Sequence, residues 1–190
     1  MPQNTTLALV AAGTNVTSIW GEGRATILKA MLQIEALIDV KVSISSIYAT
    51  PAFPPGSGPD FSNACFRFES PISAPKLLQF LHEVEAQARR TRDKRWGPRT
   101  LDLDLIAFGD EVSPSLEVWQ SWAHLDLDQQ MKRQPEQLIL PHPRVQDRAF
   151  VLKPLADIAP DWRHPILDKT VAEMLAQLPA ADIAEIRVED

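Results

Sequence analysis

The hydrophobic pattern of the first 50 residues predicts a strand, a helix and another strand. An apolar run over 7–11 ends in the turn residues 13–15, which is typical of a short buried strand. A helix is predicted over about 24–38, because four apolar residues share one helical face: Ile27, Met31, Ile34 and Ile38. Alternation of apolar and polar residues then predicts a half-buried strand over 40–48.

The middle of the chain continues with a loop, a strand and a second helix. Residues 51–59 hold four of the sixteen prolines and two of the seven glycines, so we expect a long loop. Alternation over 64–69 predicts a strand, and an apolar stripe predicts an amphipathic helix over about 77–88. Residues 89–99 follow as a basic loop.

Residues 100–108 alternate again and predict a strand. One face is expected to hold Leu101, Leu103, Leu105 and Ala107, and the other Asp102, Asp104, Ile106 and Phe108. Residues 110–137 are polar, with weak periodicity, and are interpreted as an insertion with one short helix. We expect a further helix over about 170–178 and a final strand near 183–188.

This order of elements predicts the fold class. A β-α-β-β-α-β order is typical of a ferredoxin-like α+β sandwich, an α/β arrangement with helices on one side of a mostly antiparallel sheet. The insertion and the C-terminal helix are additions to that core. We expect a single domain over residues 1–190, because no repeat or linker interrupts the pattern.

Composition narrows the class of protein. The chain has 190 residues, of which 45% are hydrophobic, enough for one real core. It contains no apolar run of about 18 residues and no secretory signal pattern, so we expect a soluble cytoplasmic protein without a membrane role. The single cysteine, Cys65, excludes an internal disulfide and fits a reducing compartment.

Charge is distributed unevenly along the chain. The formal net charge is -6, which argues against a general nucleic-acid binder. Residues 89–99 nevertheless hold six basic residues and one acidic residue, a local charge of +5 that leaves -11 for the remainder. Arginine outnumbers lysine five to one there, and guanidinium groups bind phosphate oxygens bidentately. We therefore expect a small-anion site, the alternative being a solvated charged segment.

Asp102 and Asp104 are candidate metal ligands. Two residues apart on a strand, they present carboxylates from one face at a Cα spacing of roughly 7 Å. Such a pair suits Mg²⁺, which keeps water and substrate phosphates in its coordination shell. An exposed polar strand face is the alternative, but the adjacent basic loop favours phosphoryl-transfer chemistry.

Nucleotide signatures and isolated side chains are less informative. The chain has no Walker A motif and no complete G-x-G-x-x-G, so any nucleotide is held without a P-loop. Phe61 and Asn63 share one strand face and offer an aromatic plane beside an amide. Taken alone, Phe61 is more typical of core packing, His142 of a structural role, and Phe150 is ambiguous.

Several motifs together resemble 6-hydroxymethyl-7,8-dihydropterin pyrophosphokinases, which transfer pyrophosphate from ATP to a pterin in folate biosynthesis. The most specific is R-W-G-P-R-T-L-D-L-D at 95–104. Others, in the family's order, are A-A-G-T-N at 11–15, S-S-I-Y-A-T-P at 45–51, P-D-F-S-N-A at 59–64, E-x-x-x-x-R-x-R at 85–92 and L-P-H-P-R-V-Q-D-R-A-F-V-L at 140–152. The resemblance covers about residues 7–160 and agrees with the predicted ferredoxin-like fold.

The resemblance implies a role for individual residues. Asp102 and Asp104 correspond to ligands of two Mg²⁺ ions that bridge ATP phosphates and the acceptor hydroxyl. Catalytic counterparts are Arg90, Arg92, Trp96 and Arg99; ATP-binding counterparts are Glu85, Arg92, His142 and Arg148; pterin-binding counterparts are Thr50, Pro51, Phe61, Asn63 and Phe150.

The expected protein is thus a monomeric, cytoplasmic kinase-type transferase with ATP and the pterin as its small-molecule substrates. Two other classes remain open from the residues. One is a noncatalytic pterin- or nucleotide-binding protein that uses the insertion as an interaction surface, and intact Asp102 and Asp104 argue against it. The other is RNA binding by the arginine loop, for which one short patch supplies few phosphate contacts.

Overall fold

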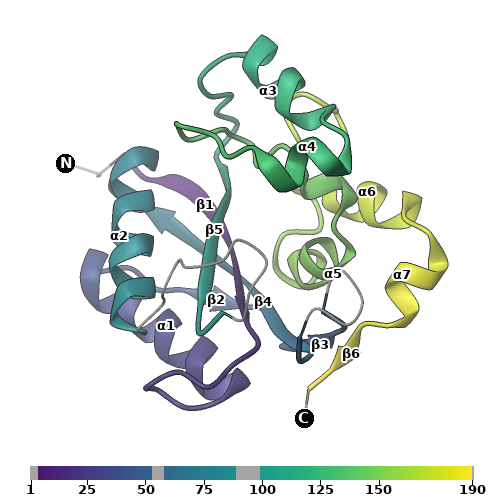
Figure 1. The fold of residues 1–190 in the computed structure, drawn as a ribbon. Coiled ribbons are helices and arrows are strands. Elements are labelled where there is room, and N and C mark those ends of the chain that lie inside the picture. The colour runs from purple at the N-terminus through teal and green to yellow at the C-terminus, as the bar shows by residue number, and fades with distance from the viewer. Residues whose placement is uncertain (1–3, 53–57, 89–98, 190) are drawn as a thin grey trace.

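One antiparallel sheet forms the centre of the protein in a computed structural model, which describes residues 4–52, 58–88 and 99–189 (Figure 1). Within these residues its strands are β1 (Thr6–Thr14), β2 (Ser43–Ile44), β3 (Tyr48–Thr50), β4 (Phe61–Ser70), β5 (Asp102–Phe108) and β6 (Arg187–Val188). The strand order is β5-β1-β4-β3-β6, with β2 also paired to β4. Every strand pair is antiparallel, so the predicted α+β class and its mostly antiparallel sheet are confirmed.

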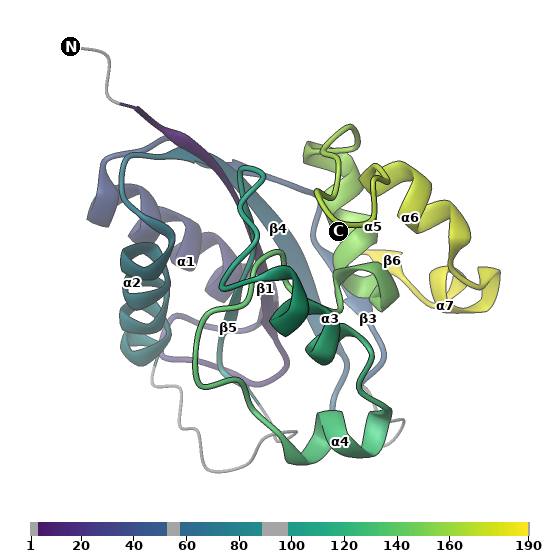
Figure 2. The same ribbon diagram turned by 90° about the horizontal axis from the view of Figure 1, so that it is seen from above.

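Helices cover both faces of this sheet, whereas one helical layer was expected (Figures 1 and 2). Helices α1 (Gly23–Ile38) and α2 (Ala74–Gln87) pack on one face, and α5 (Ala149–Ile158) packs on the other, followed by α6 (Val171–Gln177). Strand β1 accordingly sends Val10 into the first core and Leu9 into the second. Its continuous apolar run follows from burial on both faces.

The strand predicted over 40–48 is interrupted and forms β2 and β3 separately. Ser45 lies at the interruption, where its hydroxyl accepts a hydrogen bond from the Cys65 backbone N–H at 2.9 Å. The side chain thus takes the place of a backbone carbonyl in the ladder. The alternation runs from Val40 to Ser45 and breaks at Ser46, so the interruption coincides with the end of the regular pattern.

Strand β5 contains an irregularity that changes its predicted faces. Leu9 of β1 is opposite Ala107, but Val10 is opposite Leu105, which leaves Ile106 as an extra residue. The expected placement of Ala107 and Phe108 is therefore wrong: Ala107 lies in the core beneath α5, and Phe108 lies in the core beneath α1 and α2. Upstream of the bulge, Leu101, Leu103 and Leu105 share the α1/α2 core as predicted.

The insertion holds two helices instead of one, α3 (Leu116–Ala123) and α4 (Leu127–Lys132). Trp119 anchors it, because this side chain is 2% exposed and its indole N–H donates to the Pro141 carbonyl at 2.8 Å. The C-terminal strand is shorter than expected, since Ile183 lies in α7 (Ala180–Ala184) and only Arg187 and Val188 pair with β3.

A buried histidine links the insertion to the C-terminal segment. His164 is 0% exposed and makes edge-on ring contacts with Trp119 and Trp162. Its Nδ1 accepts the backbone N–H groups of Ile166 and Leu167, each at 3.2 Å, while its buried Nε2 has no hydrogen-bond partner among the described residues. Burial lowers the pKa of His164 from 6.5 to about 4, so the folded protein holds it neutral at pH 7.

Acid should therefore destabilise the fold through His164. Between pH 6.5 and about 4 the unfolded chain binds a proton that the folded chain does not, so this stabilisation is complete above pH 6.5 and is lost as the pH falls. We expect a loss of at most about 3 kcal/mol in the free energy of unfolding, measured by urea denaturation across this range. His164→Asn, which retains an acceptor for the backbone, should show a shallower pH dependence; an unchanged slope would contradict this assignment.

Candidate active site

Two carboxylates lie on the same face of β5, as the alternation predicts. Asp102 is opposite Gly13 and Asp104 is opposite Ala11, both on β1, on the sheet face that α5 covers. Their side chains are 17% and 42% exposed, so both carboxylates reach solvent. The pair can therefore bind a ligand from outside without unfolding the strand.

Each carboxylate faces an arginine from another segment. The guanidinium of Arg99 contacts Asp102, and Arg148 Nη1 lies 3.7 Å from Asp104 Oδ2. Arg148 directly precedes α5, and its guanidinium lies 5.6 Å from the centroid of the Phe150 ring. Burial lowers the pKa of Arg148, whereas Asp104 acts in the opposite direction. The result is a compact group of two acids and two bases at one edge of the sheet.

Residues implicated in pterin binding continue across the same sheet face. Asn63 on β4 and Asp102 on β5 both lie opposite Gly13 of the central strand β1. The Cα atoms of Asp102 and Asn63 are therefore two strand spacings apart, about 10 Å. The Asn63 amide donates to the Thr50 hydroxyl at 2.7 Å, and both side chains are buried. Phe61, two residues before Asn63, is half-buried on this face.

Gly13 leaves the space in which these side chains lie. A Cβ atom on Gly13 would stand 2.9 Å from Asn63 Oδ1 and 3.8 Å from a Phe61 ring carbon. Only glycine therefore lets the amide approach β1 this closely. From the sequence, Gly13 was predicted only as a turn residue within the A-A-G-T-N motif, because its partner Asn63 lies 50 positions away in the chain.

Asn15 is a second residue of this region that was not among the predicted site residues. Its side-chain Oδ1 accepts the Arg99 backbone N–H at 2.7 Å, and its own backbone N–H donates to the Arg99 carbonyl at 3.0 Å. Its Nδ2 donates to the Pro59 carbonyl at 3.2 Å. Asn15 thus fixes the backbone of Arg99 beside Asp102, and the G-T-N sequence that ends β1 was its only local signal.

His142 is attached to β5 and is uncharged. Its backbone N–H donates to the Ile106 carbonyl at 2.8 Å, and its Nδ1 accepts the Arg144 backbone N–H at 3.2 Å. Burial, followed by the positive charge of Arg148, lowers the pKa of His142 to about 3. With Nδ1 used as an acceptor, the neutral ring carries its proton on Nε2 and offers a donor there.

Glu85, which was predicted to bind ATP, is buried and binds a backbone group of the protein itself. It is 2% exposed and its Oε1 accepts the backbone N–H of Leu103 at 2.8 Å, between the two aspartates. The carboxylate therefore holds the start of β5 in place, and its expected position near a nucleotide stays a prediction.

The remaining predicted site residues are Pro51, Arg90, Arg92 and Trp96. Pro51 is exposed beside Thr50, while Arg90, Arg92 and Trp96 lie outside the described residues.

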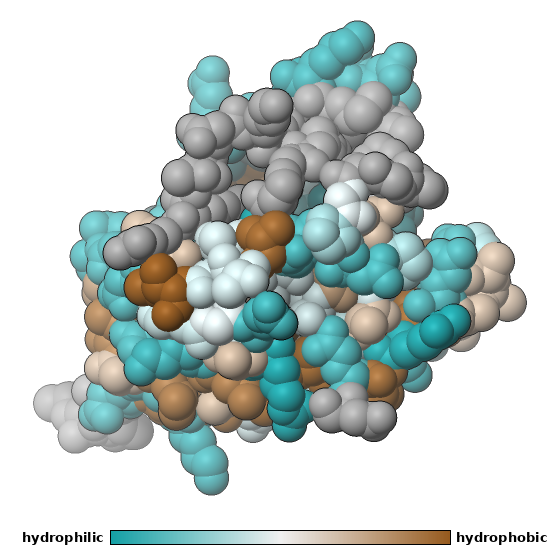
Figure 3. Space-filling model, turned by 60° about the horizontal axis from the view of Figure 1, so that its bottom comes forward, coloured by the Kyte–Doolittle hydropathy of each residue, from teal (hydrophilic) through white to brown (hydrophobic). Residues whose placement is uncertain are grey.

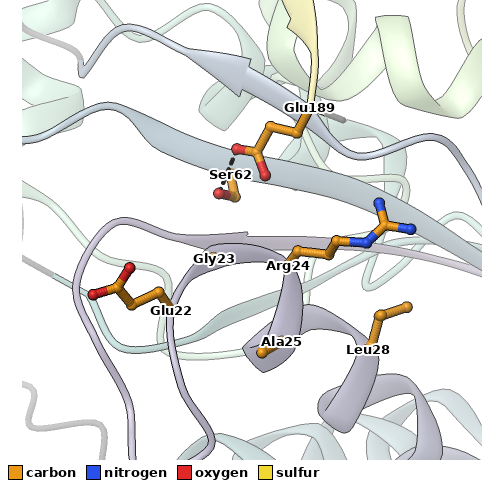
Figure 4. A pocket seen from close by; sticks show the side chains of 7 residues that line it. All are labelled: Glu22, Gly23, Arg24, Ala25, Leu28, Ser62 and Glu189. Atoms are coloured by element: carbon orange, nitrogen blue, oxygen red, sulfur yellow. Dashed lines mark hydrogen bonds between the residues drawn. The ribbon is translucent and has the colours of Figure 1, made fainter.

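Three features of the surroundings bear on the site. On the face drawn in Figure 3, hydrophobic residues are interspersed with hydrophilic ones, without one continuous apolar patch among the coloured residues. Within the described ranges, no helix is both long and apolar enough to cross a bilayer. A cavity of about 770 Å³ lies outside the group of charged residues, at the start of α1 and on the opposite face of β4 from Asn63 (Figure 4).

A family comparison decides how this arrangement is classified. The family model described as 7,8-dihydro-6-hydroxymethylpterin-pyrophosphokinase (HPPK) matches residues 9–160, which include every site residue described above. The chain belongs to the HPPK family. The resemblance noted from the sequence motifs is thereby confirmed, and the chain is a pyrophosphokinase of folate biosynthesis.

Curated HPPK relatives are similar over nearly all of this chain. A 2-amino-4-hydroxy-6-hydroxymethyldihydropteridine pyrophosphokinase from Synechocystis is 38% identical over 93% of this chain and 78% of its own length. One from Pseudomonas aeruginosa is 35% identical over 93% of this chain and 94% of its own length.

A solved structure supports the same fold. The crystal structure of Plasmodium falciparum HPPK-DHPS A437G with pteroate superposes with a TM-score of 0.62 at 15% identity. The match covers 93% of this chain and 43% of that longer chain. The HPPK fold thus extends over most of the present chain.

Proposed function

We propose that this HPPK transfers the pyrophosphoryl group of ATP to 6-hydroxymethyl-7,8-dihydropterin in a Mg²⁺-dependent reaction, giving AMP and the pterin diphosphate. The observation that carries the proposal is the arrangement of Asp102, Asp104, Arg99 and Arg148 on the sheet face that also holds Asn63 and Thr50. Charges suited to phosphates and an amide suited to a heterocycle lie about two strand spacings apart.

The donor set fits Mg²⁺. Asp102 and Asp104 supply oxygen ligands from a rigid strand, and no cluster of three or more potential metal ligands occurs among the described residues. Mg²⁺ commonly takes one or two carboxylates and completes its shell with water and phosphate oxygens. When bound, it would supply positive charge against the phosphate oxygens; two ions are proposed, following the family resemblance.

Arginine and histidine side chains would bind the donor nucleotide. Arg148 and Arg99 now neutralise the two carboxylates, so their guanidinium groups are available to phosphate oxygens once those carboxylates have other partners. His142 would donate from Nε2 throughout the physiological pH range, because its pKa is far below 7. Glu85 would support the nucleotide site indirectly, through the Leu103 backbone.

The acceptor site would bind the pterin by its edge and its faces. Asn63 offers an amide to the heterocycle edge, with its orientation set by Thr50, and Pro51 borders the same strand end. Phe61 and Phe150 are both half-buried aromatic residues on this side of the sheet and are proposed to flank the ring. The pterin hydroxymethyl oxygen would attack the β-phosphorus of ATP, with AMP as the leaving group.

Residues of the 89–98 segment complete the proposal. Arg90 and Arg92 are proposed to contact the triphosphate and Trp96 to help exclude water from the reaction, following the family resemblance. The protein is proposed to act as a monomer. The single cysteine, Cys65, is buried with a free thiol, which supports a cytoplasmic location, and the whole chain is proposed to act as one domain.

Product formation from defined substrates tests this function. Purified protein with MgATP and hydroxymethyldihydropterin should form AMP, and omission of the pterin or addition of EDTA should stop the reaction. No AMP in the complete mixture would contradict the proposed function.

A further inference from the structure

The short strand β6 extends the sheet beside the strand that carries Thr50. Val188 is opposite Tyr48, Arg187 is opposite Ala49, and the Glu189 backbone N–H donates to the Ile47 carbonyl at 2.8 Å. Val188 remains 59% exposed, so burial of apolar surface contributes little to the attachment of β6. Polar contacts therefore contribute to the attachment of this strand.

The side chain of Glu189 makes such a contact with β4. The Ser62 hydroxyl donates to Glu189 Oε1 at 2.5 Å (Figure 4), a length typical of a hydrogen bond to a charged carboxylate. Ser62 is only 9% exposed. One end of β6 thus binds β3 through its backbone and β4 through a carboxylate.

Ser62 is confined from its other side by the start of α1. A Cβ atom on Gly23 would lie 2.6 Å from Ser62 Oγ, and Gly23 has a φ of +27°, which L side chains rarely adopt. Together Gly23, Ser62 and Glu189 line the cavity of about 770 Å³ at this end of the sheet (Figure 4). The position of the Ser62 hydroxyl is therefore set by two separate segments.

Ser62 lies between the two residues of β4 that are assigned to the pterin. Its neighbours Phe61 and Asn63 point to the opposite sheet face, because strand side chains alternate. Ser62 also pairs with Ala49 of β3, one residue before Thr50, the hydroxyl that orients Asn63. A displacement of Ser62 would therefore move both pterin-facing side chains with it.

We propose that Glu189 is a positioning residue for the pterin site, acting through Ser62 from the opposite face of the sheet. The proposal rests on the proposed function, since it depends on Phe61 and Asn63 binding the pterin. Glu189 makes no direct contact with the substrate; it keeps β3 and β4 in the relative position that the pterin requires.

Equilibrium titration of the full chain with hydroxymethyldihydropterin tests this role. Glu189→Ala should raise the Kd and the KM for the pterin about 5- to 10-fold, with kcat and the KM for ATP changed less than about 2-fold. Glu189→Gln should remain within about 2-fold of the wild-type Kd, because its amide oxygen still accepts the Ser62 hydroxyl. Glu185→Ala, which removes an exposed carboxylate of the same segment, should have no effect.

The Ser62→Ala variant completes a double-mutant cycle. It should reproduce the effect of Glu189→Ala, and the double variant should be no worse than either single variant. The proposal fails if Glu189→Ala leaves the pterin Kd unchanged, raises the ATP KM equally, or is not rescued by glutamine. A wild-type protein that binds the pterin without forming AMP would instead contradict the proposed function alone, since the binding comparison still holds.

Discussion

Replacement of Asp104 by alanine is expected to reduce kcat by about 10³-fold while weakening ATP binding less than about 10-fold. Asp104 is the more exposed of the two aspartates and faces Arg148. Its negative charge is proposed to hold the cation that offsets charge on the transferring phosphate oxygens, and that contribution is largest in the transition state. Steady-state rates and nucleotide titration measure the two effects separately.

Two further variants separate charge from packing at this position. Asp104→Asn has nearly the same size but no charge, and we expect it to lose almost as much activity as the alanine variant. Asp110→Ala removes an exposed aspartate just beyond the end of the same strand and should behave as wild type. Wild-type turnover by Asp104→Ala would refute the assignment of this residue as a metal ligand.

Replacement of Arg99 by alanine should lower kcat by about 10²- to 10³-fold and change the pterin Kd less than about 3-fold. Arg99 is held at its backbone by Asn15 and contacts Asp102 with its guanidinium, so its charge is positioned before any substrate binds. Such preorganised charge acts mainly on the transition state. Rapid-mixing measurement of the chemical step, together with pterin titration, distinguishes the two parameters.

Two control variants accompany Arg99→Ala: one keeps the positive charge at position 99, and the other removes an exposed arginine outside the site. Arg99→Lys keeps the positive charge without the bidentate geometry, so an intermediate kcat is expected. Arg163→Ala removes an arginine that is 52% exposed and paired with Asp168 far from β5 in the sequence, and it should leave kcat unchanged. An unchanged kcat in Arg99→Ala, or an equal loss in pterin affinity, would count against a role in transfer.

The elements predicted best from the sequence have the most regular burial. Helices α1 and α2 follow apolar stripes that face one core, and β1 is a continuous apolar run because helices cover both sheet faces. Predictions were wrong where one residue breaks a local rule. Ser45 replaces a ladder hydrogen bond with its side chain, and Ile106 is an extra residue opposite β1. The alternation of apolar and polar residues ends at both places, but that change alone does not specify the local geometry.

The site residues likewise include some that local strand geometry predicts and others that depend on tertiary contacts. A period of two was enough to place Asp102 and Asp104 on one face, because only local strand geometry is involved. Contacts such as Asn15 with Arg99 join residues 84 positions apart, and Glu85 reaches a backbone group that any residue would offer. Such contacts depend on the tertiary fold, so a local motif such as G-T-N at 13–15 marks a residue without indicating its partner.

The most direct test of the proposed reaction is ³¹P NMR of the products formed from MgATP and hydroxymethyldihydropterin. We predict AMP and a pterin diphosphate in equal amounts with wild-type protein, because the proposed attack is at the β-phosphorus, and neither product with Asp104→Ala on the same timescale. Formation of ADP with a pterin monophosphate, or equal product formation by both proteins, would contradict the proposal that Asp102, Asp104 and their arginines form the site of pyrophosphoryl transfer.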